Sequence, residues 1–126
     1  MAVTPQEVKK LRDRTGAGML DCKNALIKSN GDFSAAEKIL KEQGLASADK
    51  RIGRATNNGS VFSVIDGGKA AMVELTCETD FVAKTDVFKK AGEKIVKAVA
   101  DSGKPEKTGA MEIMVKEAIS ILKENM

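Results

Sequence analysis

The sequence contains no histidine, tryptophan or tyrosine, and four phenylalanines are its only aromatic residues. Histidine is the most frequent general base in enzymes and the most frequent metal ligand, so its absence argues against the usual hydrolases and metalloenzymes. The missing tryptophan and tyrosine remove the usual stacking platforms for single-stranded nucleic acid. We therefore expect a protein that is not an enzyme, holds no cofactor or metal, and makes no direct contact with nucleic acid.

Cysteines and long apolar runs are scarce as well. Cys22 and Cys77 lie in apolar stretches without a CxxC motif, which indicates buried thiols in a reducing compartment rather than a disulfide framework. The first residues lack the basic and apolar regions of a secretory signal, and no apolar run approaches the ~20 residues that span a bilayer. These absences predict a cytoplasmic protein with no membrane contact.

What is present is the composition of a folded protein: 126 residues, of which 42% are hydrophobic and 31% charged. This length suffices for one ordinary domain or two small ones. The net charge of +3 is too small to indicate binding to a phosphate backbone. Gly67 and Gly68 do not form a phosphate loop, because no GK[ST] or GxGxxG pattern leads from a strand into a helix there.

The first part of the chain carries signals for consecutive helices. Thr4, Pro5 and Glu7 match a capping box with proline at the first helical position, and Gly16 ends this helix. A second helix is expected over residues 19–28. Its apolar residues are Leu20, Cys22, Ala25 and Leu26.

A third helix is predicted to begin after a cap at Asp32 and to end at Gly44, although the basic residues 45–55 could extend as a ragged helix. The polar run at residues 55–60, Ala-Thr-Asn-Asn-Gly-Ser, then interrupts all periodicity. We place a domain boundary there, so that residues 1–54 form a three-helix domain.

In the second domain, residues 55–126, the spacing of apolar residues changes from the helical period to the alternation of strands. Residues 61–65 and 70–76 alternate as strands, and the Asp-Gly-Gly turn between them predicts an antiparallel hairpin. Two helices follow to cover it, the first with Asp86 as its cap. Their apolar positions are Phe88, Ala91, Ile95 and Val99 in the first helix, and Met111, Met114, Val115, Ala118, Ile119 and Leu122 in the second. The predicted fold class is α+β.

The segment at residues 76–84, Thr-Cys-Glu-Thr-Asp-Phe-Val-Ala-Lys, joins a strand to a helix and has two interpretations. In the first, Thr79 or Asp80 caps a helical turn and Phe81 belongs to the core. In the second, Phe81 is an exposed apolar wedge beside the Asp80 carboxylate, presented to a partner's pocket. Spacing alone favours the first.

Two runs of sequence resemble the signatures of the elongation factor Ts family. Residues 11–26, LRDRTGAGMLDCKNAL, are similar to the family's first signature, and residues 77–84, CETDFVAK, are similar to its second. The resemblance implies a fold close to the one predicted above. Its parts are an N-terminal three-helix bundle similar to ubiquitin-associated domains and the beginning of an α+β core domain.

The resemblance also implies an activity, which is guanine-nucleotide exchange on GDP-bound elongation factor Tu during translation elongation. In this family, an acidic residue and a phenylalanine disturb the Mg²⁺ site of the partner, so that GDP leaves. The matching wedge segment here is Thr79, Asp80, Phe81 and Val82. The positions that match contacts of the N-terminal module with the partner are Arg12, Met19, Leu20 and Lys23.

For Leu20, the residues alone leave two places open, in the core of the bundle or on its partner-facing surface. The sequence departs from the family pattern in length, because it stops at Met126 whereas family members usually continue. This suggests a fragment or a truncated form and leaves the oligomeric state open.

The alternative function is a binding module that docks on elongation factor Tu without efficient exchange.

Overall fold

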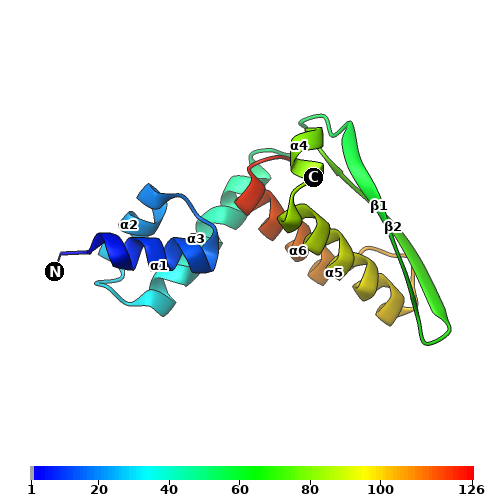
Figure 1. Cartoon of the computed structure of the whole chain (residues 1–126), viewed down its shortest axis with the longest axis horizontal. Helices are drawn as coiled ribbons and strands as arrows, with labels where there is room; N and C mark the ends of the chain where they lie inside the picture. Colours follow the sequence, from blue (N-terminus) through cyan, green and yellow to red (C-terminus); the bar gives the residue numbers. More distant parts are fainter. Residues whose placement is uncertain (1) are drawn as a thin grey trace. The chain divides into compact units, whose positions relative to one another are not determined.

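The computed structural model describes residues 2–126 and divides into two compact units, with the division between Ser47 and Ala48. The predicted α+β class is confirmed, since helices are followed by an antiparallel hairpin and further helices. The elements of the described residues, in chain order, are α1 (Pro5–Thr15), α2 (Met19–Lys28), α3 (Phe33–Asp49), β1 (Asn58–Asp66), β2 (Lys69–Cys77), α4 (Asp80–Ala83), α5 (Asp86–Ser102) and α6 (Gly109–Leu122) (Figure 1).

The capping box at the start of α1 forms as predicted. The Glu7 backbone N–H donates to Thr4 Oγ1 at 3.3 Å, and the Thr4 backbone N–H donates to Glu7 Oε2 at 2.8 Å. These bonds satisfy backbone donors that have no partner inside the helix. At the other end Gly16 adopts φ 73°, a left-handed conformation that is readily accessible to glycine, and the helix ends there.

The first unit has one core, which α1, α2 and α3 share. Leu11 and Leu26 are fully buried in it, and burial of such a side chain contributes about 1.5–3 kcal/mol. The prediction that α3 ends at Gly44 is wrong, because the helix continues to Asp49, into the basic segment left open as a helical extension. One glycine inside a helix costs only about 1 kcal/mol, and the helix-forming residues on both sides of it outweigh that cost.

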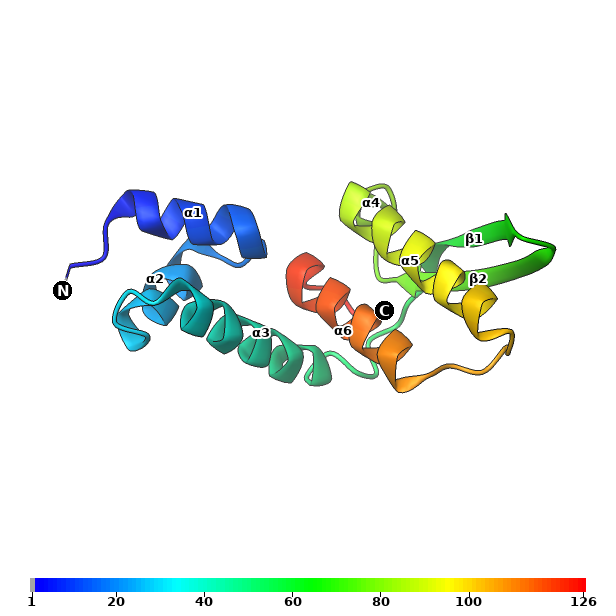
Figure 2. The same cartoon turned by 90° about the horizontal axis from the view of Figure 1, so that it is seen from below.

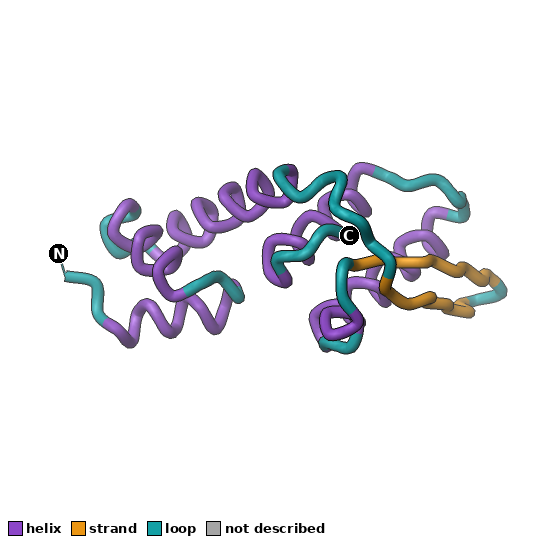
Figure 3. Tube along the Cα trace, turned by 90° about the horizontal axis from the view of Figure 1, so that it is seen from above, coloured by secondary structure: helices purple, strands orange, loops and turns teal. Residues whose placement is uncertain are grey.

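The hairpin of the second unit pairs β1 with β2 in antiparallel register, from Asp66 opposite Lys69 to Asn58 opposite Cys77. Gly67 and Gly68 make the turn with φ values of 54° and 81°, the positive values that a two-residue hairpin turn requires. The two strands lie side by side (orange in Figure 3), and their bounds, Asn58–Asp66 and Lys69–Cys77, extend beyond the predicted ranges.

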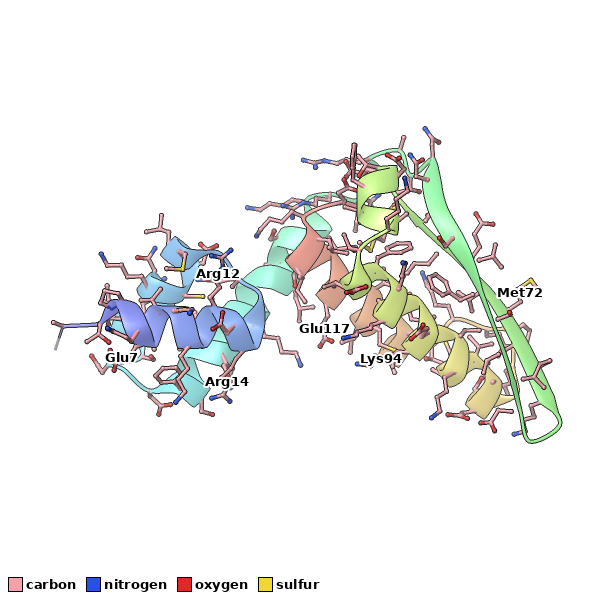
Figure 4. The ribbon with its side chains drawn as sticks, viewed as in Figure 1. Glu7, Arg12, Arg14, Met72, Lys94 and Glu117 are labelled. Carbon is pink, nitrogen blue, oxygen red and sulfur yellow. The ribbon has the colours of Figure 1, made fainter. Side chains whose placement is uncertain are left out.

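Helix α5 packs on both strands of the hairpin and on α6 (Figure 2). The buried core of this unit contains Leu75, Cys77, Phe88 and Ile95. The centroids of the Phe62 and Phe88 rings lie 6.0 Å apart. The outer face of the hairpin carries apolar side chains that stay exposed, among them Met72, which points away from α5 (Figure 4).

The cap of α5 differs from the prediction. Thr85 holds the N-cap position, where its Oγ1 accepts from the Phe88 backbone N–H at 3.2 Å, and Asp86 is the first residue of the helix. Both residue types suit a cap, and Asp86 remains favourable in the first turn because a negative charge there complements the helix dipole. No helix in the described residues is both long and apolar enough to cross a bilayer.

Candidate functional site

The single-turn helix α4 connects β2 to α5 and carries the predicted wedge segment. Thr79 is its N-cap, with Oγ1 accepting from the Val82 backbone N–H at 3.4 Å. Asp80 is therefore the first residue of the turn rather than its cap.

The two sides of this turn differ in burial. Val82 and Ala83 pack against the core of the second unit and attach the turn to it. Phe81 lies on the other side, where 79% of its surface is exposed. The interpretation of Phe81 as a core residue is thus wrong for this chain. An exposed phenylalanine on an anchored turn is an apolar group that is free to meet a partner.

The Asp80 carboxylate is accessible as well. Its Oδ2 lies 3.4 Å from Lys84 Nζ, and both side chains are more than half exposed. An exposed pair four residues apart on a helix contributes about 0.3–0.5 kcal/mol, so it holds the carboxylate only weakly. The turn therefore presents a carboxylate and an aromatic ring side by side in sequence.

A group of polar contacts fixes the start of the turn, and sequence reasoning missed it. Glu124, which follows α6, accepts from both the backbone N–H and the hydroxyl of Thr79. Glu78 Oε1 accepts from the Asn125 backbone N–H at 2.8 Å and lies 3.5 Å from Arg54 Nη1. No short-range pattern signals these contacts, because their partners are far apart along the chain.

Cys77 lies beneath the same turn. Its Sγ donates to the Thr79 carbonyl at 3.1 Å, and its side chain is fully buried. Burial raises the pKa of the Cys77 thiol, and the negative charge of Glu124 raises it further. The thiol is therefore a structural group rather than a reactive one.

The second set of predicted residues lies in the first unit. Arg12 stands in the last turn of α1, and Met19, Leu20 and Lys23 lie on the first two turns of α2 (Figure 4 labels Arg12). All four side chains are exposed, Leu20 to 67%. Of the two places left open for Leu20, the core of the bundle is therefore excluded, and the side chain lies on the surface.

Ile27 adds to this surface and was not predicted. It is 52% exposed and lies seven residues after Leu20, which is two turns further along the same side of α2. The spacing of seven residues is visible in the sequence, but the apolar set predicted for this helix does not include Ile27. We call Arg12, Met19, Leu20, Lys23 and Ile27 the α2 surface.

The wedge segment and the α2 surface belong to different units of the chain. Neither is built like a metal centre. In residues 2–126 no three side chains among histidine, cysteine, aspartate and glutamate gather closely enough to hold a metal ion. What the two surfaces offer is exposed apolar area next to charged groups, which is typical of protein–protein contacts.

The sequence was compared with family models and with curated proteins. No family model matches it. It is 45% identical over 126 residues to elongation factor Ts of Borrelia hermsii, covering 100% of this chain and 45% of that protein. It is 52% identical over 102 residues to elongation factor Ts of Fervidobacterium nodosum, covering 79% of this chain and 52% of the relative. Elongation factor Ts of Aquifex aeolicus is 42% identical over 147 positions, covering 100% and 50%.

The chain thus spans about half the length of the curated relatives it matches. Two of these alignments cover the whole of this chain, so both signature segments lie inside the matched region. The chain belongs to the elongation factor Ts family and corresponds to the N-terminal part of its members.

Proposed function

We propose that this chain acts in translation elongation as a guanine-nucleotide exchange factor, promoting GDP release from elongation factor Tu by disturbing the Mg²⁺ site of that partner. The observation that carries the proposal is the 79% exposure of Phe81 on a turn whose other side is packed into the core. A side chain of this size is usually buried. Its burial in a partner's pocket would contribute about 1.5–3 kcal/mol to the complex.

The neighbouring carboxylate fits the same role. Mg²⁺ prefers oxygen ligands, and the Asp80 side chain is exposed and weakly paired. A phenylalanine inserted between side chains near the bound nucleotide, with the Asp80 carboxylate beside it, favours a distorted arrangement of the Mg²⁺ shell and of the loop that holds the phosphates. A protein that binds this distorted state better must weaken nucleotide binding by the same factor.

The α2 surface supplies the second contact in this proposal. Its apolar members Met19, Leu20 and Ile27 are all exposed, and Arg12 and Lys23 add positive charge beside them. Such a surface suits an apolar helix face of the partner with acidic residues at its rim. In this proposal the α2 surface provides affinity for elongation factor Tu, whereas the Phe81 turn promotes the release of GDP.

The test is the rate at which a fluorescent GDP analogue leaves elongation factor Tu in the presence of excess unlabelled GDP. The full chain is titrated to saturation, and the maximal rate is compared with spontaneous release. We expect acceleration by the unchanged chain and its loss in Phe81→Ala. Met72→Ala is the matched control, because Met72 is 72% exposed on the outer face of the hairpin and lies outside the proposed contact surfaces.

Two outcomes contradict the proposal. If the unchanged chain binds elongation factor Tu at saturation without accelerating release, the chain is a binding module only. If Phe81→Ala accelerates release as well as the unchanged chain, exchange does not depend on this turn.

A further inference from the structure

We infer that Glu124 is a positioning residue that holds the Thr79–Val82 turn in the geometry that presents Phe81. The inference rests on the proposed function and adds a residue that lies 45 positions from the turn. It is carried by the two hydrogen bonds that Thr79 donates to Glu124 and by the one that Thr79 accepts from Val82.

Both oxygens of the Glu124 carboxylate bind Thr79. Oε1 accepts from the Thr79 backbone N–H at 2.9 Å, and Oε2 accepts from the Thr79 hydroxyl at 2.7 Å. Hydrogen bonds to a charged acceptor are shorter and stronger than neutral ones. A carboxylate that grips one residue at two points fixes its orientation as well as its position.

The second of these bonds also determines how Thr79 caps the turn. A hydroxyl has one hydrogen to donate and two lone pairs to accept with. Since the hydrogen points to Glu124, a lone pair remains for the Val82 backbone N–H, which lies 3.4 Å from the same oxygen. Glu124 therefore holds the Thr79 hydroxyl in the orientation that caps α4, and Phe81 lies between the two residues that this cap joins.

The chain reaches this position through a tight turn after α6. Lys123 adopts φ 60°, a left-handed conformation that reverses the chain direction at the end of the helix. Asn125 then adds a second tie, since its backbone N–H donates to Glu78 and its side chain donates to the Arg54 carbonyl at 2.8 Å. The residues before and after Glu124 are thus fixed independently of Thr79.

Loss of this carboxylate would leave the Thr79 N–H and hydroxyl without their acceptor in a half-buried place. A missing bond to a charged acceptor typically changes a local equilibrium by roughly tenfold or more. We expect the turn to open more often and Phe81 to be presented less often. Glu124→Gln should have an intermediate effect, since an amide oxygen still accepts from one donor but the amide nitrogen cannot accept from the other.

The first test uses the full chain alone. Amide hydrogen exchange at Thr79 and Val82, followed by NMR, should be roughly tenfold faster in Glu124→Ala than in the unchanged chain. The control is Glu112→Ala, which removes an exposed carboxylate from the first turn of α6, the helix that precedes Glu124; Glu112 Oε1 lies 3.8 Å from Lys107 Nζ. Unchanged exchange in Glu124→Ala would overturn the inference whether or not the chain promotes nucleotide release.

The second test uses GDP release from elongation factor Tu. Glu124→Ala should lower the maximal release rate several-fold and change the half-saturating concentration less, because the α2 surface is intact. The double variant Phe81→Ala/Glu124→Ala should be no slower than Phe81→Ala alone, since no wedge remains to be positioned. A further loss in the double variant would overturn the inference by assigning Glu124 a role unrelated to Phe81.

The two tests separate the inference from the proposed function. Suppose that amide hydrogen exchange at Val82 is faster in Glu124→Ala, but the unchanged chain does not accelerate GDP release. This result supports the role of Glu124 in holding the turn and contradicts only the exchange-factor proposal.

Discussion

The ring of Phe62 on β1 occupies the space that a side chain at Gly92 on α5 would need. A methyl group at Gly92 would overlap the edge of that ring, and Gly92 itself is buried in the middle of its helix. The glycine is therefore required by the close approach of helix and hairpin. Glycine within a helix is less favourable than alanine by about 1 kcal/mol. The helix bears this cost because only glycine leaves room for the Phe62 ring.

We therefore predict that Gly92→Ala destabilises the protein by about 1–3 kcal/mol, the usual cost of overpacking, despite the better helix propensity of alanine. Urea unfolding followed by circular dichroism measures this. Gly109→Ala is the control, because Gly109 begins α6 and a Cβ there would meet nothing within 4 Å. Equal behaviour of the two variants would mean that Phe62 can move aside at no cost.

Leu20→Ala is predicted to weaken binding to elongation factor Tu while leaving the fold intact. Loss of a central apolar contact should raise the half-saturating concentration in the release assay about tenfold, which corresponds to about 1.4 kcal/mol. The maximal release rate should be unchanged, because the Phe81 turn lies in the other unit. Leu26→Ala gives the contrast, since Leu26 is fully buried and its loss should cost about 2–5 kcal/mol of stability.

Acid should weaken the start of α1. The hydrogen bonds from the Thr4 backbone and hydroxyl lower the pKa of Glu7 from its ordinary value of 4.5. Because the folded-state pKa is the lower one, the stabilisation is complete above 4.5 and is lost as the pH falls through the folded-state value. Helix content measured by circular dichroism during acid titration should fall less in Glu7→Gln than in the unchanged chain over that range. An identical response would mean that other carboxylates dominate.

The two thiols should be protected at neutral pH and sensitive to alkali. Burial raises the pKa of Cys22 and of Cys77 above the ordinary value of 9.0. Their contribution to stability is therefore fully present below pH 9.0 and is lost as the pH rises through the folded-state values. We predict slow reaction with a thiol reagent in the folded chain and fast reaction in urea. Fast labelling of the folded chain at neutral pH would show that one of these sites opens readily.

Local chemistry made much of the fold predictable. The capping box at Thr4 and Glu7 and the two glycines of the hairpin turn each specify one backbone geometry, so they locate elements without knowledge of the rest. The cap of α5 could not be assigned this way, because Thr85 and Asp86 are neighbouring residues that both suit the position.

The sequence pattern alone could not predict which apolar side chains are exposed. Leu20 and Phe81 both stand where helical spacing permits burial, and burial is the usual place for such side chains. Under the proposed function their exposure serves a partner that the sequence does not contain, and only the resemblance to a family pointed to it. The bond between Thr79 and Glu124 joins segments that only the fold brings together, and spacing gives no sign of it.

The exposure of Phe81 also makes this turn a suitable place for a spectroscopic reporter. The sequence has no tryptophan and no tyrosine, so Phe81→Trp would give the chain a single strong fluorophore. Since most of the phenylalanine surface is already in solvent, the larger indole needs little rearrangement of the core. Its emission would respond to the moment at which water around the turn is replaced by another protein, which would separate arrival at a partner from the departure of GDP.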